Sequence, residues 1–281
     1  MEEYISDNSL YIRSKNNSMI NRKMIGRVLG MLLFIELGMF LLCAGVSAGY
    51  GESDYKYFLY TCIINAVVGG LLLLYGRGAE NKMSRRDGYC VVTLSWVFFT
   101  FFGMLPFYFS GSIDTITNAF FETMSGFTTT GATILDDIES LSHGMLFWRS
   151  LTQWIGGLGI VFFTIAILPI FTTGGVQLFS AESTGVTHDR THPKINVMAK
   201  WLWTIYLVLT VSETVLLMFG GMSLFDAICQ SFATTATGGY STKQNSISYW
   251  NSPYIEYVVA IFMIVSSINF SLFLMLSLIH I

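Results

Sequence analysis

Two short threonine–glycine stretches interrupt an otherwise apolar sequence. The first is FTTTGAT, residues 127–133, and the second is TTATGGYST, residues 234–242. A glycine-containing turn can expose its backbone carbonyl oxygens, because glycine adopts φ values that other residues resist. Threonine tolerates extended backbone and adds a hydroxyl oxygen. Carbonyl oxygens can replace the hydration shell of an ion, as in potassium-channel filters. The two stretches therefore predict a site for a monovalent cation.

The two stretches belong to an internal repeat with an offset of 108 residues. This offset aligns identical residues, namely Ala119 with Ala227, Thr129 with Thr237, and Gly131 with Gly239. Each stretch follows about a dozen moderately apolar residues, which are too few to span a bilayer and are typical of a re-entrant segment. The C-terminal end of such a half-helix carries roughly half a negative charge, which favours a cation. The repeat therefore predicts a unit of span, half-helix, turn and span that occurs twice.

The composition indicates a membrane protein. Hydrophobic residues make up 53% of the 281 residues and charged residues only 12%, whereas a soluble domain carries about 25% charged residues. A spanning helix needs roughly 20 mostly apolar residues, and six such segments are present: 25–48, 57–76, 89–109, 148–170, 199–219 and 254–276. We expect an all-α polytopic membrane protein, with a two-span lead-in followed by two span–pore-helix–span repeats.

The distribution of Lys and Arg predicts the orientation. If the N-terminus is cytoplasmic, twelve of the 15 Lys and Arg fall on the inner side, and three fall on the outer side: Lys56, Arg149 and Lys243. Since Lys and Arg accumulate in cytoplasmic loops, both threonine–glycine stretches are expected to face outward. The predicted division begins with a cytosolic tail at 1–24, the two-span lead-in at 25–88 and the first repeat at 89–171. A cytosolic loop at 172–198 and the second repeat at 199–276 follow, and residues 277–281 are expected to be a non-native end.

Three glutamates inside apolar segments are candidate functional residues. Glu36 and Glu213 lie within predicted spans, where ionisable groups are costly and often functional. Glu213 could serve transport directly, or it could contact water or a short helix. Glu122 lies on the first short helix and could attract cations or form hydrogen bonds behind the turn. Its counterpart at the repeat offset is Gln230, which has a similar shape without charge and favours the second interpretation.

Several local patterns predict how the short helices are held. Ser223 and Asp226 have the Ser-x-x-Asp capping pattern at the start of the second short helix, and Ser112 and Asp114 are expected to begin the first. Three glycines indicate close helix packing: Gly156, Gly157 and Gly159. Three carboxylates after the first stretch either raise the local cation concentration or form a solvated loop: Asp136, Asp137 and Glu139.

Other function classes find little support. The net charge of −3 gives no indication of nucleic-acid binding, and the four cysteines have no disulfide or zinc spacing. His188 and His192 have a spacing that would suit a metal on a helix, but no third ligand is evident. We interpret them instead as part of an inner surface that contacts a regulatory subunit. No hydrolase or metalloprotease motif and no pair of aspartates lies within the spans, so an enzyme is not expected.

Three segments carry a resemblance to a known family. NAFFETMSGFTTTGAT, LFWRSLTQWIGGLGIVFFTIAILP and DAICQSFATTATGGYST resemble the TrkH/KtrB family of bacterial potassium-uptake proteins, and the TrkH branch most closely. The resemblance implies that four span–pore-helix–span repeats surround one pore, of which this chain holds two. It also implies potassium as the substrate with no cofactor, a multi-pass protein of the inner membrane, a homodimer, and a cytosolic nucleotide-binding regulatory subunit, TrkA in the TrkH branch.

The resemblance further implies which residues bind potassium. The first filter strand would be Thr129, Thr130, Gly131 and Ala132, and the second would be Thr237, Gly238, Gly239 and Tyr240. We expect Gly131 and Gly239 to be the filter glycines. Gly238 is the alternative to Gly239 if the alignment of the two repeats is off by one residue. The chain would then be a pore-forming subunit for potassium uptake. The alternative is a two-repeat cation channel that forms its pore by dimerisation.

The last residues are unusual. LSLIHI, residues 276–281, is what the nucleotide sequence CTGTCTCTTATACACATC encodes, and that sequence is the terminal repeat of a transposase used to prepare sequencing libraries. We expect that the reading frame runs into adapter sequence and that the natural protein continues past about Met275. The alternative is that six ordinary apolar residues close a helix.

Overall fold

The computed structural model describes residues 20–79, 84–159 and 194–268, and within these ranges it contains helices and no strands. In chain order the helices are α2 (Arg22–Gly49), α3 (Tyr55–Tyr75), α4 (Arg85–Gly103), α5 (Leu105–Phe109), α6 (Ile116–Phe127), α7 (His143–Gly157), α10 (Lys194–Phe219), α11 (Leu224–Thr235), the 3-10 helix η2 (Ser246–Trp250) and α12 (Pro253–Ser267). The expected all-α fold is confirmed for these residues.

Four helical segments are long and apolar enough to cross a membrane: Arg22–Gly49, Tyr55–Tyr75, Arg86–Phe109 and Leu202–Phe219. They correspond to the first, second, third and fifth expected spans. Helices α7 and α12 begin the other two, and the remainders of those spans lie outside the described residues, as do His188, His192 and the segment 276–281. The chain is therefore a polytopic membrane protein.

Two short helices, α6 and α11, lie where the half-helices were expected. Each has 12 residues, and their first residues are 108 positions apart, the offset of the sequence repeat. Ser223 caps α11, because its hydroxyl oxygen accepts a hydrogen bond from the Asp226 N–H at 3.1 Å. The residue that caps α6 is Thr115, whose hydroxyl oxygen accepts from the Asn118 N–H at 3.2 Å.

The expectation that Ser112 and Asp114 begin α6 is therefore wrong. The hydroxyl of Ser112 lies 2.8 Å from that of Ser110 in the preceding turn. Thr115 has the extended backbone that an N-cap residue needs, with φ −118° and ψ 142°. The N-cap of α6 is the residue with the required backbone conformation, and the sequence pattern did not identify that residue.

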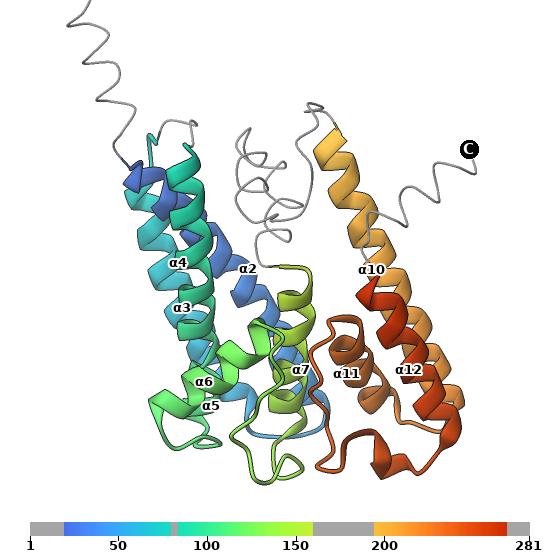
Figure 1. The fold of residues 1–281 in the computed structure, drawn as a ribbon. Helices are drawn as coiled ribbons and strands as arrows, with labels where there is room; N and C mark the ends of the chain where they lie inside the picture. The colour runs from blue at the N-terminus through green and yellow to red at the C-terminus, as the bar shows by residue number, and fades with distance from the viewer. Residues whose placement is uncertain (1–19, 80–83, 160–193, 269–281) are drawn as a thin grey trace, which may run out of the picture.

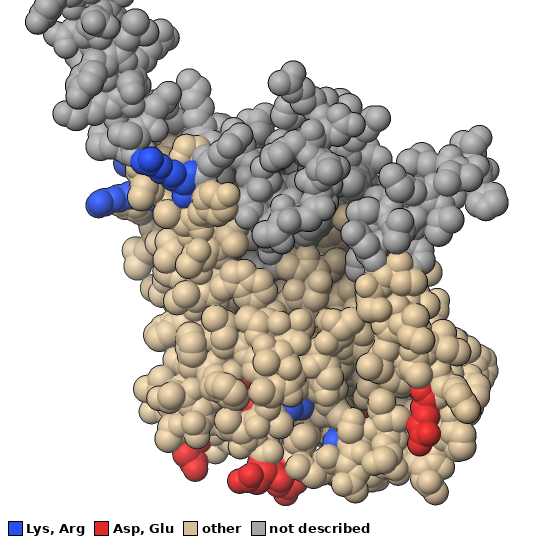
Figure 2. Space-filling model, in the orientation of Figure 1, with Lys and Arg blue, Asp and Glu red and all other residues tan. Residues whose placement is uncertain are grey.

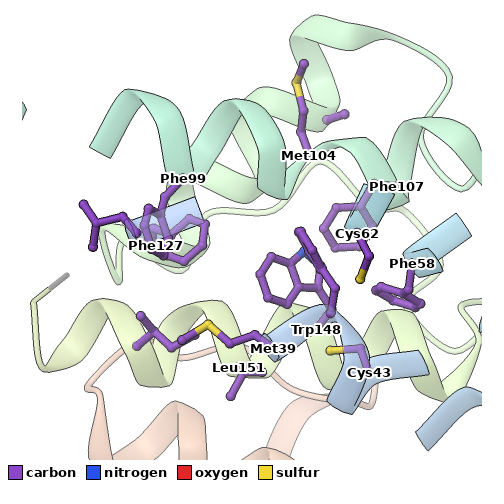
Figure 3. Close-up of a cluster of buried hydrophobic side chains, with 14 of the residues drawn as sticks. Met39, Cys43, Phe58, Cys62, Phe99, Met104, Phe107, Phe127, Trp148 and Leu151 are labelled. Carbon is purple, nitrogen blue, oxygen red and sulfur yellow. The ribbon is translucent and has the colours of Figure 1, made fainter. Parts of the chain in front are cut away.

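Helix α7 connects the two halves of the molecule. It contacts α2 and α6 on one side and α11 on the other (Figure 1). Trp148 of α7 lies in the main apolar cluster, with Phe99 and Phe127 on one side and Phe58 on the other (Figure 3). The indole N–H of Trp148 donates to the Gly103 carbonyl oxygen at 2.9 Å. This bond ties α7 to the end of α4, the first span of the same repeat.

Charged side chains separate along the long axis of the bundle. On the face shown in Figure 2, most Lys and Arg gather where α2 and α4 begin, Asp and Glu gather toward the opposite end, and a little blue also shows in that acidic half. The short helices α6 and α11 lie toward the acidic end (Figure 1). Both threonine–glycine stretches follow these helices, so they lie in the half of the molecule where negative charge collects.

Candidate cation site

Both short helices end in the same hydrogen-bonded turn. After α6, the N–H groups of Thr129 and Thr130 donate to the carbonyl oxygens of Gly126 and Ser125 at 3.0 and 2.9 Å. The same two bonds recur after α11, from Thr237 to Thr234 at 2.9 Å and from Gly238 to Ala233 at 2.8 Å. This pair of bonds is the Schellman motif, which usually places glycine at the left-handed position. Here threonine occupies that position in both repeats.

Left-handed backbone recurs at matching positions in the two turns. Thr129 and Thr237 have φ values of 53° and 54°. Gly131 and Gly239, two residues further on, have φ values of 75° and 84°. A side-chain-bearing residue in this region costs about 1–2 kcal/mol, and such strain is concentrated at functional sites. The backbone strain at Thr129 and Thr237 therefore lies at the same position relative to the end of α6 and of α11.

The two turns contact each other although their sequences are a hundred residues apart. A Cβ atom built on Gly131 would collide with the carbonyl oxygen of Gly238, and it would lie 3.9 Å from the Cα of Gly239. A Cβ on Gly238 would collide with the Gln153 side chain of α7. The same Gln153 accepts a hydrogen bond from the Tyr240 N–H at 3.0 Å. Gly131 and Gly238 are thus needed for close approach.

Helix α7 also packs closely against the ends of both short helices. A Cβ on Gly156 would collide with the carbonyl oxygen of Phe127, and one on Gly157 would lie 2.7 Å from the Cα of Ala236. Phe127 is the last residue of α6, and Ala236 directly follows α11. Gly156 and Gly157 therefore allow the close helix packing that the sequence predicted.

A buried ion pair joins the first short helix to the second turn. The Arg149 Nε donates to the Glu122 Oε1 at 2.8 Å, and the two side chains are 2% and 0% exposed. An Nη of Arg149 donates to the Ser241 carbonyl oxygen at 3.0 Å, and its guanidinium carbon lies 3.6 Å from the centre of the Tyr240 ring. Arg149 thus connects residues of both repeats.

The other contacts of Glu122 hold the segment that follows the first turn. The Thr133 hydroxyl donates to its Oε1 at 2.9 Å, and the Ile134 N–H donates to its Oε2 at 3.0 Å. The Tyr240 hydroxyl donates to the backbone carbonyl oxygen of Glu122 at 2.9 Å. The carboxylate is occupied by these donors and by Arg149. The geometry therefore gives Glu122 a supporting position behind the turn.

Sequence reasoning missed Arg149, because it was counted only as one of three outer positive charges. A signal was present in the repeat. The offset of 108 aligns Glu122 with Gln230 and Arg149 with Tyr257, so the second repeat lacks both charges together. The joint absence of the two charges fits the ion pair that the structure shows. Gln230 has one buried side-chain oxygen without a hydrogen-bond partner among the described residues.

Three other acidic candidates are placed by their contacts. Glu213 is fully buried, and its Oε2 accepts from the hydroxyl of Thr235, the last residue of α11, at 3.5 Å. Glu139 forms an ion pair with Lys243 at 3.3 Å, so this outer carboxylate is paired with a residue of the second repeat. Glu36 lies in the lead-in, where the Asn65 amide donates to its Oε2 at 3.0 Å.

A second ionisable pair holds the start of α7. The Glu52 Oε1 accepts from the His143 N–H at 2.9 Å and lies 2.7 Å from the ring Nδ1, while the Gly144 N–H donates to Oε2 at 3.4 Å. The His143 ring stacks on Tyr50 and meets the edge of Phe225 in α11. Partial burial would raise the pKa of Glu52, but the hydrogen bonds from His143 and Gly144 outweigh it and lower the pKa below its usual value.

This pair predicts a pH-dependent stability. The ordinary pKa of a glutamate is about 4.3, and that of folded Glu52 is lower. Ionised Glu52 therefore stabilises the fold above the unfolded pKa, and this stabilisation is lost as the pH falls through the folded pKa. We expect Glu52→Gln to lower the unfolding temperature at neutral pH and to lose less further stability on acidification than the unmodified protein.

The measurement is thermal unfolding of the purified protein as a function of pH. Asp54→Asn is the matched control, because Asp54 lies in the same loop and its side chain forms no capping hydrogen bond to α3. Parallel pH profiles for the unmodified protein and Glu52→Gln would contradict the assignment.

The comparisons with known proteins agree with this architecture. The TrkH family, described as "Cation transport protein", matches residues 55–280. The Trk system potassium uptake protein TrkH of Escherichia coli (strain K12) is 42% identical over 250 residues, which cover 88% of this chain and 52% of that protein. The Trk system potassium uptake protein TrkG of the same strain is 32% identical over 252 residues, covering 89% and 52%.

A solved structure is also similar. The crystal structure of the potassium transporter TrkH from Vibrio parahaemolyticus superimposes with a TM-score of 0.77 at 34% identity, covering 90% of this chain and 51% of that chain. The chain thus spans about half the length of the relatives that it matches. Its family match, its relatives and its fold agree, and the chain belongs to the TrkH family of cation transport proteins.

Proposed function

We propose that this chain supplies half of a pore for potassium uptake and that its two turns form two of the strands of a cation filter. The relatives named above are potassium uptake proteins. The observation that carries the proposal is the contact between Gly131 and Gly238. It brings two turns from different repeats together at the C-terminal, negative ends of two helices. Their carbonyl oxygens would replace the hydration shell of the ion.

The proposed potassium-binding residues are Thr129, Thr130, Gly131 and Ala132 in the first turn and Thr237, Gly238, Gly239 and Tyr240 in the second. The left-handed φ values at Gly131 and Gly239 support these two as equivalent glycines, with Gly238 instead packed on Gln153. Glu122 and Arg149 position the turns.

We further propose an inner-membrane location with a cytoplasmic N-terminus, a homodimer, and regulation by a cytosolic nucleotide-binding subunit.

The test is growth at low potassium. The full-length gene is expressed in a cell that lacks its own potassium-uptake systems, beside an empty vector, and the amount of protein in the membrane is measured in parallel. We expect growth at potassium concentrations where the empty vector fails. A protein that reaches the membrane in normal amounts and restores no growth would overturn the proposed function.

A further inference from the structure

A buried polar pair lies in the lead-in, apart from the two turns. Glu36 is in the middle of α2 and Asn65 is on the facing surface of α3, and both residues are 0% exposed. The amide nitrogen of Asn65 donates to the Glu36 Oε2 at 3.0 Å. Among the described residues, no Lys, Arg or His forms an ion pair with Glu36. Both helices are apolar enough to span a membrane, so water does not stabilise a charge there.

Each member of the pair has one oxygen without a hydrogen-bond partner in the part of the chain that is described. These atoms are the Glu36 Oε1 and the Asn65 Oδ1, and both are buried. An unsatisfied buried acceptor costs about 1–3 kcal/mol, and more if it is charged. An ionised carboxylate offers only acceptors, and so does an amide oxygen. Ionised Glu36 therefore cannot satisfy either atom.

One proton bound to Glu36 would provide both unpaired oxygen atoms with a hydrogen-bond arrangement. A protonated carboxyl group has one O–H donor in addition to its acceptor oxygen, and a carboxamide has N–H donors and an acceptor oxygen. The two groups are therefore complementary. The Asn65 N–H already donates to the Glu36 Oε2, and we infer that a proton on Oε1 donates to the Asn65 Oδ1. We propose that Glu36 and Asn65 form a proton-binding site in which Glu36 is a neutral carboxylic acid.

A calcium ion fits this place less well than a proton. An oxygen-ligated ion such as Ca²⁺ takes about six to eight oxygen ligands, whereas the pair offers two free oxygens. The thiol of Cys62, the titratable group on α3 that faces Glu36, donates to the Leu37 carbonyl oxygen at 3.6 Å. No group of three or more His, Cys, Asp or Glu in the described ranges could hold a metal.

The site lies close to the first short helix. A Cβ atom built on Gly103 would lie 3.2 Å from the Glu36 Oε1 and 3.0 Å from side-chain carbons of Thr123 and Phe127. Those two residues belong to the last turns of α6, whose C-terminal end carries partial negative charge. A carboxylate at Glu36 would add repulsion there. The bound proton removes that charge, and this conclusion does not depend on which ion the protein transports.

Infrared difference spectroscopy at neutral pH tests the protonation directly. The sample is the purified full-length protein in lipid, and the spectrum of Glu36→Gln is subtracted from that of the unmodified protein. Glutamine keeps a carbonyl oxygen and an N–H donor, so it matches the protonated acid in shape and bonding. We expect the difference to show the carbonyl band of a protonated carboxyl group. A carboxylate band at this position would overturn the proposal.

Two further variants sharpen the test. Glu256→Gln is the matched control, because Glu256 is exposed at the start of α12, and it should remove a carboxylate band and leave the protonated band unchanged. Asn65→Leu removes the partner, so the protonated band should move to the frequency of a carboxyl group without a hydrogen bond. An unmoved band would refute the pairing. Asn65→Ala replaces Asn65→Leu in this comparison if the larger side chain prevents folding.

Discussion

Replacing Gly131 with serine is expected to reduce potassium uptake about tenfold or more and to weaken discrimination against sodium. The φ of Gly131 is 75°, and a Cβ there would collide with the carbonyl oxygen of Gly238. Serine therefore adds about 1–2 kcal/mol of backbone strain and also displaces the second turn. The strain lowers stability, whereas the displacement moves carbonyl oxygens that would replace the hydration shell of the ion, so we assign the loss of transport to the displacement. The measurements are potassium uptake and sodium competition in the growth-rescue cell.

Gly111→Ser is the matched control for backbone strain. Gly111 has nearly the same φ, 71°, and a Cβ on it would have no neighbour within 4 Å. It lies in the turn before α6, outside both threonine–glycine stretches. We expect Gly111→Ser to lose a little thermal stability and no transport, and Gly131→Ser to lose more stability, because of its collision with Gly238, and to lose transport as well. Unchanged selectivity in Gly131→Ser would contradict the assignment of this turn to the filter.

The sequence predicted the helices well because hydropathy and the repeat are local signals. The expected span at 25–48 corresponds to α2 at Arg22–Gly49, and the span at 57–76 to α3 at Tyr55–Tyr75. The two moderately apolar segments before the threonine–glycine stretches correspond to the 12-residue helices α6 and α11. A cap depends on the backbone conformation of one residue, which is why Thr115 was not identified.

The lateral contacts could not be predicted from the same signals. Arg149 bonds to the Ser241 carbonyl oxygen, 92 positions away in the sequence, and neither hydropathy nor spacing indicates such a contact. The approach of Gly131 to Gly238 depends on α7, whose Gly156 and Gly157 pack on the ends of α6 and α11. A single sequence shows which residues have the required chemistry, but only the packed helices show which of them meet.

The ion pair between Arg149 and Glu122 predicts a large and non-additive effect on stability. Both side chains are almost fully buried, and removing one partner of a buried pair costs about 3–5 kcal/mol, because the other charge remains without compensation. We therefore expect Arg149→Met and Glu122→Gln each to destabilise the protein by about this amount. The double variant has no uncompensated charge, so it should lose much less than the two single losses together.

A double-mutant cycle of chemical unfolding measures this coupling, and a surface pair provides the control. Lys243 and Glu139 are 3.3 Å apart but partly exposed, and such pairs contribute about 0–1 kcal/mol. Lys243→Met and Glu139→Gln should therefore show small, nearly additive effects. Additive losses in the Arg149 and Glu122 cycle would show that the buried pair is not coupled. Arg149 also supports Tyr240 and Ser241, so we expect Arg149→Met to impair potassium uptake even at temperatures where the protein stays folded.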